Sequence, residues 1–488
     1  MKNLLRNFTL VVISFLAFSC EEEENKNLSS TSIAKIIEVT PEFSSLKEAL
    51  DITGLTSTFE GSGDFTVFVP TNDAFAAILG GLTVEEYHAA YPCSLEKILK
   101  YHVLGSRVVS TALTDGQMAT TLLGEDVKIM LETNPNFPEI DPGLGVVEEK
   151  SIFINESRVF ARDVNCSNGI IHVIDAVLQP KTVVDIASAN PDLSTLVTAL
   201  ERTGLTAELK KGCFTVFAPT NAAFDTFFTS LGAGIDVNNV DVDVLKNILL
   251  NHTLGSIIKS NDIPAAVYVS TLSPINTTAN APTISMFVQK SGSVVTINGG
   301  VENGGATVTT ADIEANNGVI HLVSNVIAIP TLVNHVIANP DFDTLQAVVT
   351  STGGDFGDQS AVLNALGGLT ASAPATLFAP NNTAFTNLLS ELSTAVISPT
   401  AAQLSSVLQY HVVVGNVRSS ALPGILSGTG IVPTLNSQNI TFSLVDGAYK
   451  ITGTFTPTRP SSTIIQSLDI QGSNGVIHTI DKVLLPTL

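Results

Sequence analysis

The chain has 488 residues, which is too long for one hydrophobic core and predicts about two to four domains. Its residues are 44% hydrophobic and only 14% charged, and this composition excludes a largely disordered chain. The formal net charge of −22, with no basic patch in the sequence, excludes nucleic acid as a partner. Tryptophan is absent, which weakens any function that depends on stacked aromatic rings.

The first thirty residues have the pattern of an export signal followed by a tether. Lys2 and Arg6 precede an apolar run over 8–18 that is too short to cross a bilayer, so residues 1–19 are predicted to be a signal peptide. The run ends in Leu-Ala-Phe-Ser-Cys, which looks like a bacterial lipoprotein cleavage box with Cys20 as the lipid-bearing residue. A plain soluble signal is the alternative.

Residues 20–30 are expected to form an acidic tether. The four glutamates at 21–24 resemble a tract that routes some lipoproteins to the cell surface, and a solvated spacer is the other interpretation. We therefore expect a protein of the cell envelope that is lipid-anchored to the outer membrane and exposed at the surface. The membrane would be reached only through that anchor.

Three ordered sets of the same motifs occupy the rest of the chain. The first motif reads FTVFVPTNDAF at 65–75, FTVFAPTNAAF at 214–224 and ATLFAPNNTAF at 375–385. An Asn-Gly turn followed by an apolar, histidine-containing strand recurs at 168–175, 317–324 and 474–481. Between these motifs lie Tyr101-His102, Asn251-His252 and Tyr410-His411. The spacing predicts three domains, 31–179, 180–329 and 330–488, which we call repeats 1, 2 and 3.

Each repeat is predicted to mix helices and strands. The closing segment of repeat 1, residues 170–178, is apolar on both faces. It is therefore expected to be a strand inside a sheet that is covered on both sides. In repeat 2, apolar residues between 193 and 200 recur at helical spacing, and Gly204 ends the helix. Residues 214–218 predict a strand, after which Thr220 or Asn221 caps the next helix.

These motifs resemble those of the fasciclin family, and three copies cover residues 31–488. The resemblance implies an α+β fold, in which each domain is a wedge-shaped β-sandwich with packed helices, and a role in adhesion or matrix binding. In animal members, adhesive sequences lie at the Tyr-His region and at an Asp-Ile pair before the Asn-Gly turn. By position, the candidate binding residues are Tyr101, His102, Asp312, Ile313, Tyr410, His411, Asp469 and Ile470. Only repeat 3 has both pairs.

Six of the eight histidines occupy the two repeated positions. His172, His321 and His478 lie among apolar strand residues, and we interpret them as core residues that donate one hydrogen bond and accept another. His102, His252 and His411 are interpreted in the same way, with a ligand-binding role as the alternative for either set.

The sequence contains no pattern that predicts a metal site, a cofactor or a catalytic site. HxxxH and CxxC motifs are absent, and the Asp-rich stretch 236–243 lacks the glycine and distal glutamate of a calcium loop. No Gly-x-Ser-x-Gly elbow or phosphate-binding loop is present, although paired acids for glycoside cleavage are not excluded. No repeat has a set of His, Cys or acidic residues that the other repeats lack, so we expect an array of binding domains and not an enzyme.

The cysteines are Cys20, Cys93, Cys166 and Cys213. Cys93 and Cys166 share repeat 1 and form the candidate disulfide, which leaves Cys213 as a buried thiol. Together these features predict a surface lipoprotein that binds an extracellular protein or polysaccharide. A glycan-capture protein and a structural spacer on the envelope are the rival interpretations.

Overall fold

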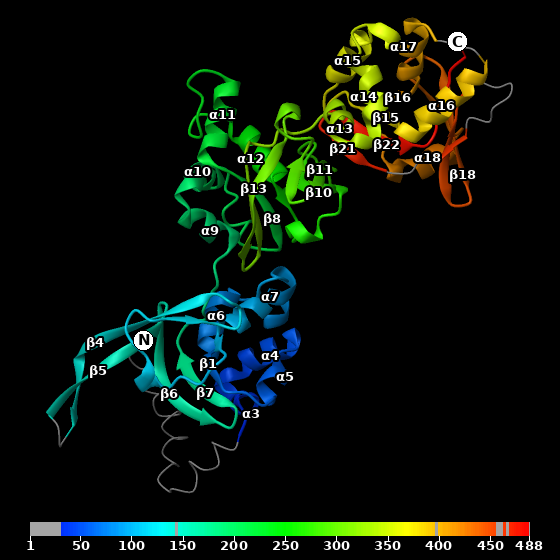
Figure 1. The fold of residues 1–488 in the computed structure, drawn as a ribbon. Helices are drawn as coiled ribbons and strands as arrows, with labels where there is room; N and C mark the ends of the chain where they lie inside the picture. Colours follow the sequence, from blue (N-terminus) through cyan, green and yellow to red (C-terminus); the bar gives the residue numbers. More distant parts are fainter. Residues whose placement is uncertain (1–30, 142–144, 396–398, 455–461, 465–467, 488) are drawn as a thin grey trace. The chain divides into compact units, whose positions relative to one another are not determined.

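The computed structural model describes residues 31–141, 145–395, 399–454, 462–464 and 468–487 (Figure 1). The predicted signal peptide, the tether and Cys20 lie outside the described residues. The chain divides into two compact units. Unit 1 holds repeat 1 and the chain up to Thr182, together with Lys210–Cys213 and Ala315–Asn317, and unit 2 holds the remainder of repeat 2 with repeat 3. Within the described ranges, no helix is long and apolar enough to cross a membrane.

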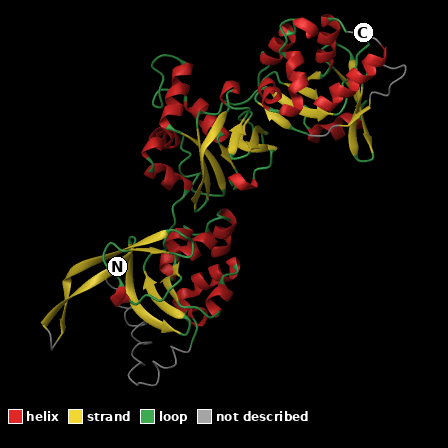
Figure 2. Ribbon diagram, in the orientation of Figure 1, coloured by secondary structure: helices red, strands yellow, loops and turns green. Residues whose placement is uncertain are grey.

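Repeat 1 is built on one seven-stranded sheet in the order β2-β1-β7-β6-β5-β4-β3, with helices against it (Figure 2). Its central strands β1 and β7 are parallel and carry the first and last repeated motifs. The helices are α3 (Ile33–Val39), α4 (Ser44–Thr53), α5 (Thr56–Glu60), α6 (Asn72–Leu79), α7 (Val84–Ala90) and α8 (Leu95–Tyr101), with short 3-10 turns η1 (Pro41–Phe43) and η2 (Ser110–Ala112). The strands are β1 (Phe65–Pro70), β2 (Val103–Leu104), β3 (Met118–Thr120), β4 (Asp126–Asp141), β5 (Gly145–Ile154), β6 (Ser157–Cys166) and β7 (Gly169–Ile174).

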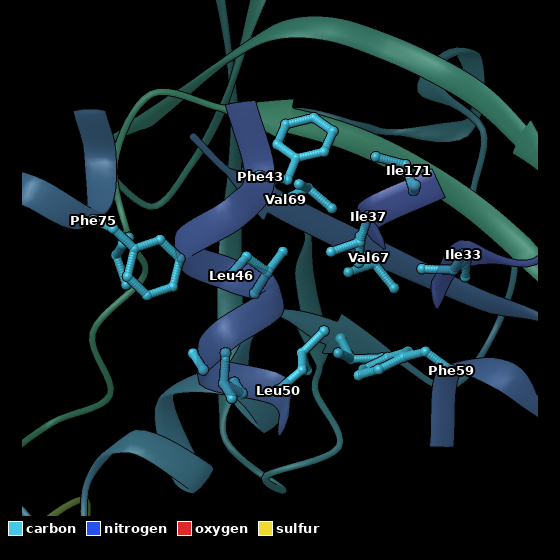
Figure 3. Packing of buried hydrophobic residues seen from close by; sticks show 14 of the residues in the cluster. Ile33, Ile37, Phe43, Leu46, Leu50, Phe59, Val67, Val69, Phe75 and Ile171 are labelled. Atoms are coloured by element: carbon cyan, nitrogen blue, oxygen red, sulfur yellow. The ribbon is translucent and has the colours of Figure 1, made fainter. Parts of the chain in front are cut away.

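Apolar side chains cover both faces of this sheet. Val67, Val69 and Ile171 pack with the helices, where Ile37, Leu46 and Phe75 are also buried (Figure 3). On the other face, Phe68 and Ile174 pack with Tyr101 and residues of β4 and β5. The prediction of a strand covered on both sides is therefore confirmed, although β7 ends at Ile174, four residues before the predicted end at 178.

Repeat 2 closes its strands into a barrel in the order β10-β11-β12-β13-β14-β8-β9. Its helices are α9 (Val183–Ala189), α10 (Ser194–Arg202), α11 (Asn221–Leu231) and α12 (Val242–Asn251), with 3-10 turns η3 (Pro191–Leu193), η4 (Ser260–Asp262) and η5 (Val301–Asn303). The strands are β8 (Phe214–Pro219), β9 (Thr253–Leu254), β10 (Ala266–Pro274), β11 (Thr283–Ser291), β12 (Val294–Ile297), β13 (Ala306–Ala315) and β14 (Gly318–Val323).

Repeat 3 has two four-stranded sheets, β16-β15-β22-β21 and β17-β18-β19-β20. Its helices are α13 (Leu332–Ala338), α14 (Asp343–Val349), α15 (Ser360–Gly367), α16 (Asn382–Ala395), α17 (Ala401–Tyr410) and α18 (Leu422–Ser427), with 3-10 turns η6 (Pro340–Phe342), η7 (Gly354–Phe356) and η8 (Ser419–Ala421). The strands are β15 (Ala375–Pro380), β16 (Val412–Val414), β17 (Ile431–Pro433), β18 (Asn439–Val445), β19 (Ala448–Thr452), β20 (Ser462–Ile464), β21 (Ile470–Gly472) and β22 (Gly475–Ile480).

Local sequence signals act where they were expected. Helix α10 holds the predicted periodic segment except for Leu193, which lies in the preceding turn η3, and Gly204 follows the helix with a φ of 70°. Thr220 caps α11 by accepting a hydrogen bond from the backbone N–H of Ala223. At the start of β22, a Cβ on Gly475 would lie 2.0 Å from the carbonyl oxygen of Ala375, so the parallel pair β15–β22 requires glycine there.

Repeats 2 and 3 pack against each other inside unit 2. The ring of Tyr268 on β10 lies 5.5 Å from that of His335 on α13. The backbone N–H of Gln471 on β21 donates to Ser285 Oγ on β11 over 2.9 Å. Where β12 ends, a Cβ on Gly299 would come within 3.0 Å of Ala338 Cα, so glycine permits the close approach of the two repeats.

Candidate functional site

The histidine of each Tyr-His or Asn-His position joins the end of a helix to the closing segment of its repeat. The Nδ1–H of His102 donates to the carbonyl of Ile98 over 2.7 Å, and its Nε2 accepts from the backbone N–H of Leu178 over 2.9 Å. His252 and His411 make the same two bonds in their repeats. Because these rings are completely buried, desolvation lowers the pKa of all three histidines to about 4.

The tyrosine hydroxyls are also bonded internally. Tyr101 Oη donates to the carbonyl of Asp126 over 2.9 Å, and Tyr410 Oη donates to that of Asn439 over 2.6 Å. Tyr410 has no exposed surface and Tyr101 has 5%. Asn251, which replaces the tyrosine in repeat 2, is equally buried and donates from Nδ2 to the carbonyls of Ile327 and Ala328. These side chains are therefore out of reach of a ligand in the folded protein.

The aspartate of the Asp-Ile position belongs to a second network that is found in every repeat. In repeat 2, the Asp312 carboxylate accepts from the backbone N–H and the hydroxyl of Ser260. The backbone N–H of Asp312 donates to His321 Nδ1, and the ring's Nε2–H donates to the carbonyl of Ile258. Asp163, Ser110 and His172 repeat the arrangement, as do Asp469, Ser419 and His478.

This network explains the backbone conformation of the aspartates. Asp163, Asp312 and Asp469 have φ values of 61°, 61° and 63°, a left-handed conformation that the bonds to serine and histidine compensate. Burial alone would raise the pKa of Asp312, but the hydrogen bonds from Ser260 hold it below its ordinary value. Burial lowers the pKa of His172 and His478. The prediction that the strand histidines are core residues is confirmed.

The aspartates among the candidate binding residues are only partly buried. The side chains of Asp312 and Asp469 are 31% and 20% exposed, Ile313 is half-buried and Ile470 is buried. Sequence reasoning missed the serine partners, Ser110, Ser260 and Ser419. Their signal was a serine eight residues after each repeated histidine, at 102, 252 and 411 with partners at 110, 260 and 419. In repeat 3 the two candidate pairs thus belong to separate internal networks.

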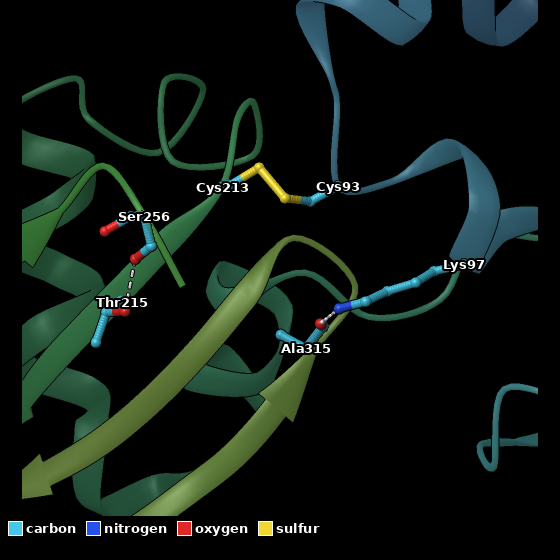
Figure 4. Close-up of a disulfide and its surroundings, with 6 residues drawn as sticks. All are labelled: Cys93, Lys97, Cys213, Thr215, Ser256 and Ala315. Atoms are coloured by element: carbon cyan, nitrogen blue, oxygen red, sulfur yellow. Dashed lines mark hydrogen bonds between the residues drawn. A yellow bond between two sulfur atoms is a disulfide. The ribbon is translucent and has the colours of Figure 1, made fainter. Parts of the chain in front are cut away.

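The predicted disulfide between Cys93 and Cys166 is wrong. Cys93 is bonded to Cys213, which belongs to the segment Lys210–Cys213 of unit 1 (Figure 4). Cys93 lies in a turn after α7, whereas Cys166 is buried in the core at the end of β6, so Cys166 is a free thiol whose burial raises its pKa to about 12. Cys213 is accordingly not the buried thiol that was expected. Close to the disulfide, Lys97 Nζ donates to the carbonyl of Ala315 over 2.7 Å (Figure 4).

A groove of about 480 Å³ lies beside Asp312 in repeat 2. Val295 and Val308 provide its apolar lining, and its polar lining comes from Ser260, Asn261, Lys290, Ser293 and Thr309. Lys290 Nζ donates to the carbonyl of Ser260 over 2.7 Å, so the serine that Asp312 holds also fixes the ammonium group. The part of the chain that the structure describes has no cluster of three or more His, Cys, Asp or Glu residues suited to a metal ion.

The comparisons with known proteins agree with the threefold architecture. The fasciclin domain model matches residues 41–180, 191–330 and 342–486. Periostin of Homo sapiens is 27% identical over 464 residues, which cover 93% of this chain and 47% of periostin. Transforming growth factor-beta-induced protein ig-h3 of Oryctolagus cuniculus is 29% identical over 300 residues, which cover 58% of this chain and 39% of that protein.

Protein sll1483 of Synechocystis is 32% identical over 152 residues, which cover 31% of this chain and 75% of that protein. The chain thus spans less than half the length of periostin and of ig-h3.

Proposed function

Because this chain belongs to the fasciclin family, we propose that it is a cell-surface adhesion protein that binds an extracellular protein or polysaccharide through its repeated domains. The observation that carries the proposal is the presence of three domains whose two histidine networks are all intact. No domain keeps a free set of reactive groups at the repeated positions, which supports binding over catalysis.

The repeated motifs are proposed to be the scaffold of binding, with the contacts made by exposed surfaces around them. Tyr101, His102, Tyr410 and His411 would influence adhesion only by holding each domain together, because their polar atoms are already bonded inside it. Asp312 and Ile313, like Asp469 and Ile470, would act by positioning the turns η4 and η8. Three weak sites on one chain would gain avidity on the order of 10²–10⁴ if they engage together.

The groove beside Asp312 favours a polysaccharide as one class of ligand. Its hydroxyl and carboxamide groups suit sugar hydroxyls, the lysine suits a carboxylate, and the partly exposed Val308 suits the apolar face of a sugar ring. Lys290→Gln should weaken binding of an acidic oligosaccharide such as oligogalacturonate. Lys246 is exposed on α12 of the same domain, so Lys246→Gln is the matched control and should leave that binding unchanged.

The anchor belongs to the same proposal. We expect lipidation of Cys20 to hold the mature chain on the outer membrane, with residues 20–30 as the tether. Cys20→Ala should move the protein from the membrane fraction to the soluble fraction. A membrane-bound variant, together with a wild-type protein that takes up no labelled fatty acid, would argue against the anchor.

Attachment of coated beads tests the adhesive function. Beads carrying the chain should bind to at least one surface in a panel of matrix proteins, polysaccharides and whole cells, whereas albumin-coated beads should not. Tyr410→Phe removes a hydroxyl that donates to the carbonyl of Asn439 and accepts from the backbone N–H of Thr454. Attachment should fall only in proportion to any loss of folding measured by circular dichroism. Failure to attach to every surface would favour the spacer interpretation.

A further inference from the structure

Each repeat has an equivalent sheet face, defined by the residues below, which is exposed or is covered by a neighbouring repeat. We call it the tail face. Thr121, Thr271 and Thr434 are equivalent because they pair with Leu104, Leu254 and Val413, each two residues after the repeated histidine. Three residues earlier stand Met118, Tyr268 and Ile431, and one residue later stand Leu122, Leu272 and Leu435. Strand alternation places the earlier and later residues on one face, opposite to the buried threonines.

In repeat 2 the tail face is covered by repeat 3. Tyr268 meets His335 of α13, and Ser285 accepts a hydrogen bond from Gln471 of β21. We call α13 with β21, and their equivalents in the other repeats, the head face. His335 is completely buried in this junction, and its Nε2–H donates to the carbonyl of Gln471 over 3.2 Å. The chain therefore joins these two repeats tail to head.

The tail face of repeat 3 is open among the residues that the structure describes. Ile431 is 48% exposed and Leu435 is 40% exposed. Beside them, Val414 is 74% exposed and occupies the position of Gly105 and Gly255 in the other repeats. The neighbouring residues Pro433, Asn439 and Thr441 are uncharged. This patch is neutral and apolar in a protein with a net charge of −22.

The head face of repeat 1 is the counterpart at the other end of the chain. Its helix α3 is equivalent to α13, because Ile33 and Leu332 each donate their backbone N–H to the asparagine of the Asn-Gly turn in their own repeat. Val39 therefore stands at the position of Ala338, and it is 53% exposed whereas Ala338 is 4% exposed. The other two head faces belong to repeats 2 and 3. The head face of repeat 3 is already covered by repeat 2. In repeat 2, Ala315–Asn317 at the end of β13 belongs to unit 1.

We propose that the tail face of repeat 3 binds the head face of repeat 1 in a second molecule, so that molecules associate head to tail. Two observations indicate that the partner is a second molecule of the same protein. Equivalent faces already pair in the junction inside unit 2, and the patch is neutral, which avoids repulsion between two acidic molecules. Few side chains take part, so a dissociation constant on the order of 10 µM to 1 mM is expected. A heterologous contact of this kind adds one molecule after another, and it produces chains of increasing length unless a ring closes.

Sedimentation of the chain from residue 20 onward, carrying Cys20→Ser, tests the association. The mean mass should rise with concentration beyond that of a dimer. Ile431→Lys and Val39→Lys should each weaken the association at least about tenfold. Leu389→Lys is the matched control, because Leu389 is 60% exposed on α16 of repeat 3 and lies outside the patch. All three changes make the molecule less acidic, so a loss cannot be attributed to added repulsion.

Mixing the two variants separates this proposal from its rivals. The Ile431→Lys molecule keeps an intact head face and the Val39→Lys molecule keeps an intact tail face, so an equimolar mixture should form a 1:1 dimer and nothing longer. Self-association that survives Val39→Lys but not Ile431→Lys would show a tail-to-tail dimer and overturn the proposal. A chain that stays monomeric up to about 1 mM would overturn it as well. Urea unfolding of each variant verifies that it is folded, and the control shows the effect of a surface lysine alone.

Discussion

The two sets of repeated histidines are neutral and use opposite tautomers. The helix-end histidine carries its proton on Nδ1, because that atom faces the carbonyl of Ile98, while the strand histidine carries it on Nε2, which faces the carbonyl of Val108. Each ring thus joins two buried backbone groups that come from different elements. Such a ring has no free nitrogen for a ligand or a metal ion.

His172→Ala should lower the free energy of unfolding of unit 1 by about 1–3 kcal/mol, because the carbonyl of Val108 loses its donor and the N–H of Asp163 its acceptor. Urea unfolding measures the loss. His88→Ala in α7, outside both networks, is the comparison and should cost less. A fully stable His172→Ala protein that had lost ligand binding would instead assign this histidine a direct role in binding.

Acid should destabilise the fold in a defined range of pH. The pKa of His102 is about 4 in the folded state against an ordinary value of 6.5, so the unfolded chain binds more protons and the stability falls as the pH drops from 6.5 toward 4. Between pH 6.5 and 5, His102 alone should cost about 2 kcal/mol.

Urea unfolding at pH 7 and pH 5 measures this loss. Carboxylates with lowered pKa values, such as those of Asp51 and Asp358, add to it only at more acidic pH. Equal stability at the two pH values would contradict the assignment of His102 as a buried neutral ring.

At the scale of elements, the two central strands of each repeat were predictable from their motifs, although their parallel pairing was not. The Asn-Gly turn begins the closing strand, and its asparagine side chain accepts from the first turn of the opening helix, as Asn168 does from the N–H of Ile33. The strand-Pro-Thr-Asn motif supplies the partner strand and the cap of the next helix. Local signals therefore determine which strands and helices form in each repeat.

Gly475→Ala should disrupt the β15–β22 pair. The added Cβ would overlap the carbonyl of Ala375 and meet backbone, which cannot yield easily, so a loss of about 3 kcal/mol or more is expected. Gly447→Ala is the control, since Gly447 also has a positive φ of 77° but no atom within 4 Å of the added Cβ. It should cost only about 1–2 kcal/mol. Thermal or urea unfolding that ranks the two variants equally would show that the close contact is unimportant.

The sequence predicted the wrong disulfide because Cys93 and Cys166 lie in the same repeat, whereas Cys213 lies in the next one. The partner of Cys93 lies 120 residues away in a short segment that belongs to unit 1. Peptide mapping of the Cys20→Ser protein without reduction should recover a peptide that links Cys93 to Cys213. A maleimide should modify Cys166 only after the protein is unfolded. A linked peptide that contains Cys166 would contradict the structure.

At the scale of the whole molecule, the sequence predicted three fasciclin repeats but not which residues form the junction between repeats 2 and 3. It predicted that His411 is a core residue but not that Tyr410 is buried. A residue type shows which hydrogen bonds a side chain can make. Whether those bonds are made inside the protein depends on partners that are distant in sequence, because the N–H that donates to His102, for example, belongs to Leu178, 76 residues away. Contacts between repeats depend on side chains such as Tyr268, which occupy one position in one repeat only.

Fragment 331–488 should therefore be less stable than the same residues within fragment 181–488, because Tyr268 and Ser285 of repeat 2 are missing from it. Tyr268→Ala should lower the stability of the longer fragment by about 3 kcal/mol. The test is urea unfolding of the two fragments, with Tyr449→Ala, on half-buried β19, as a substitution away from the junction. Equal stability of repeat 3 in both fragments would show that the junction adds nothing to folding.

The junction between repeats 2 and 3 also carries its own optical reporter. The chain has no tryptophan and six tyrosines, and Tyr268 is the single tyrosine of repeat 2. Its ring is held between Phe287 and His335, at centroid distances of 4.9 and 5.5 Å. With Tyr410 and Tyr449 replaced by phenylalanine in the fragment 181–488, all near-ultraviolet emission from tyrosine would come from this contact. The separation of two domains could then be followed by intrinsic fluorescence in an unlabelled protein.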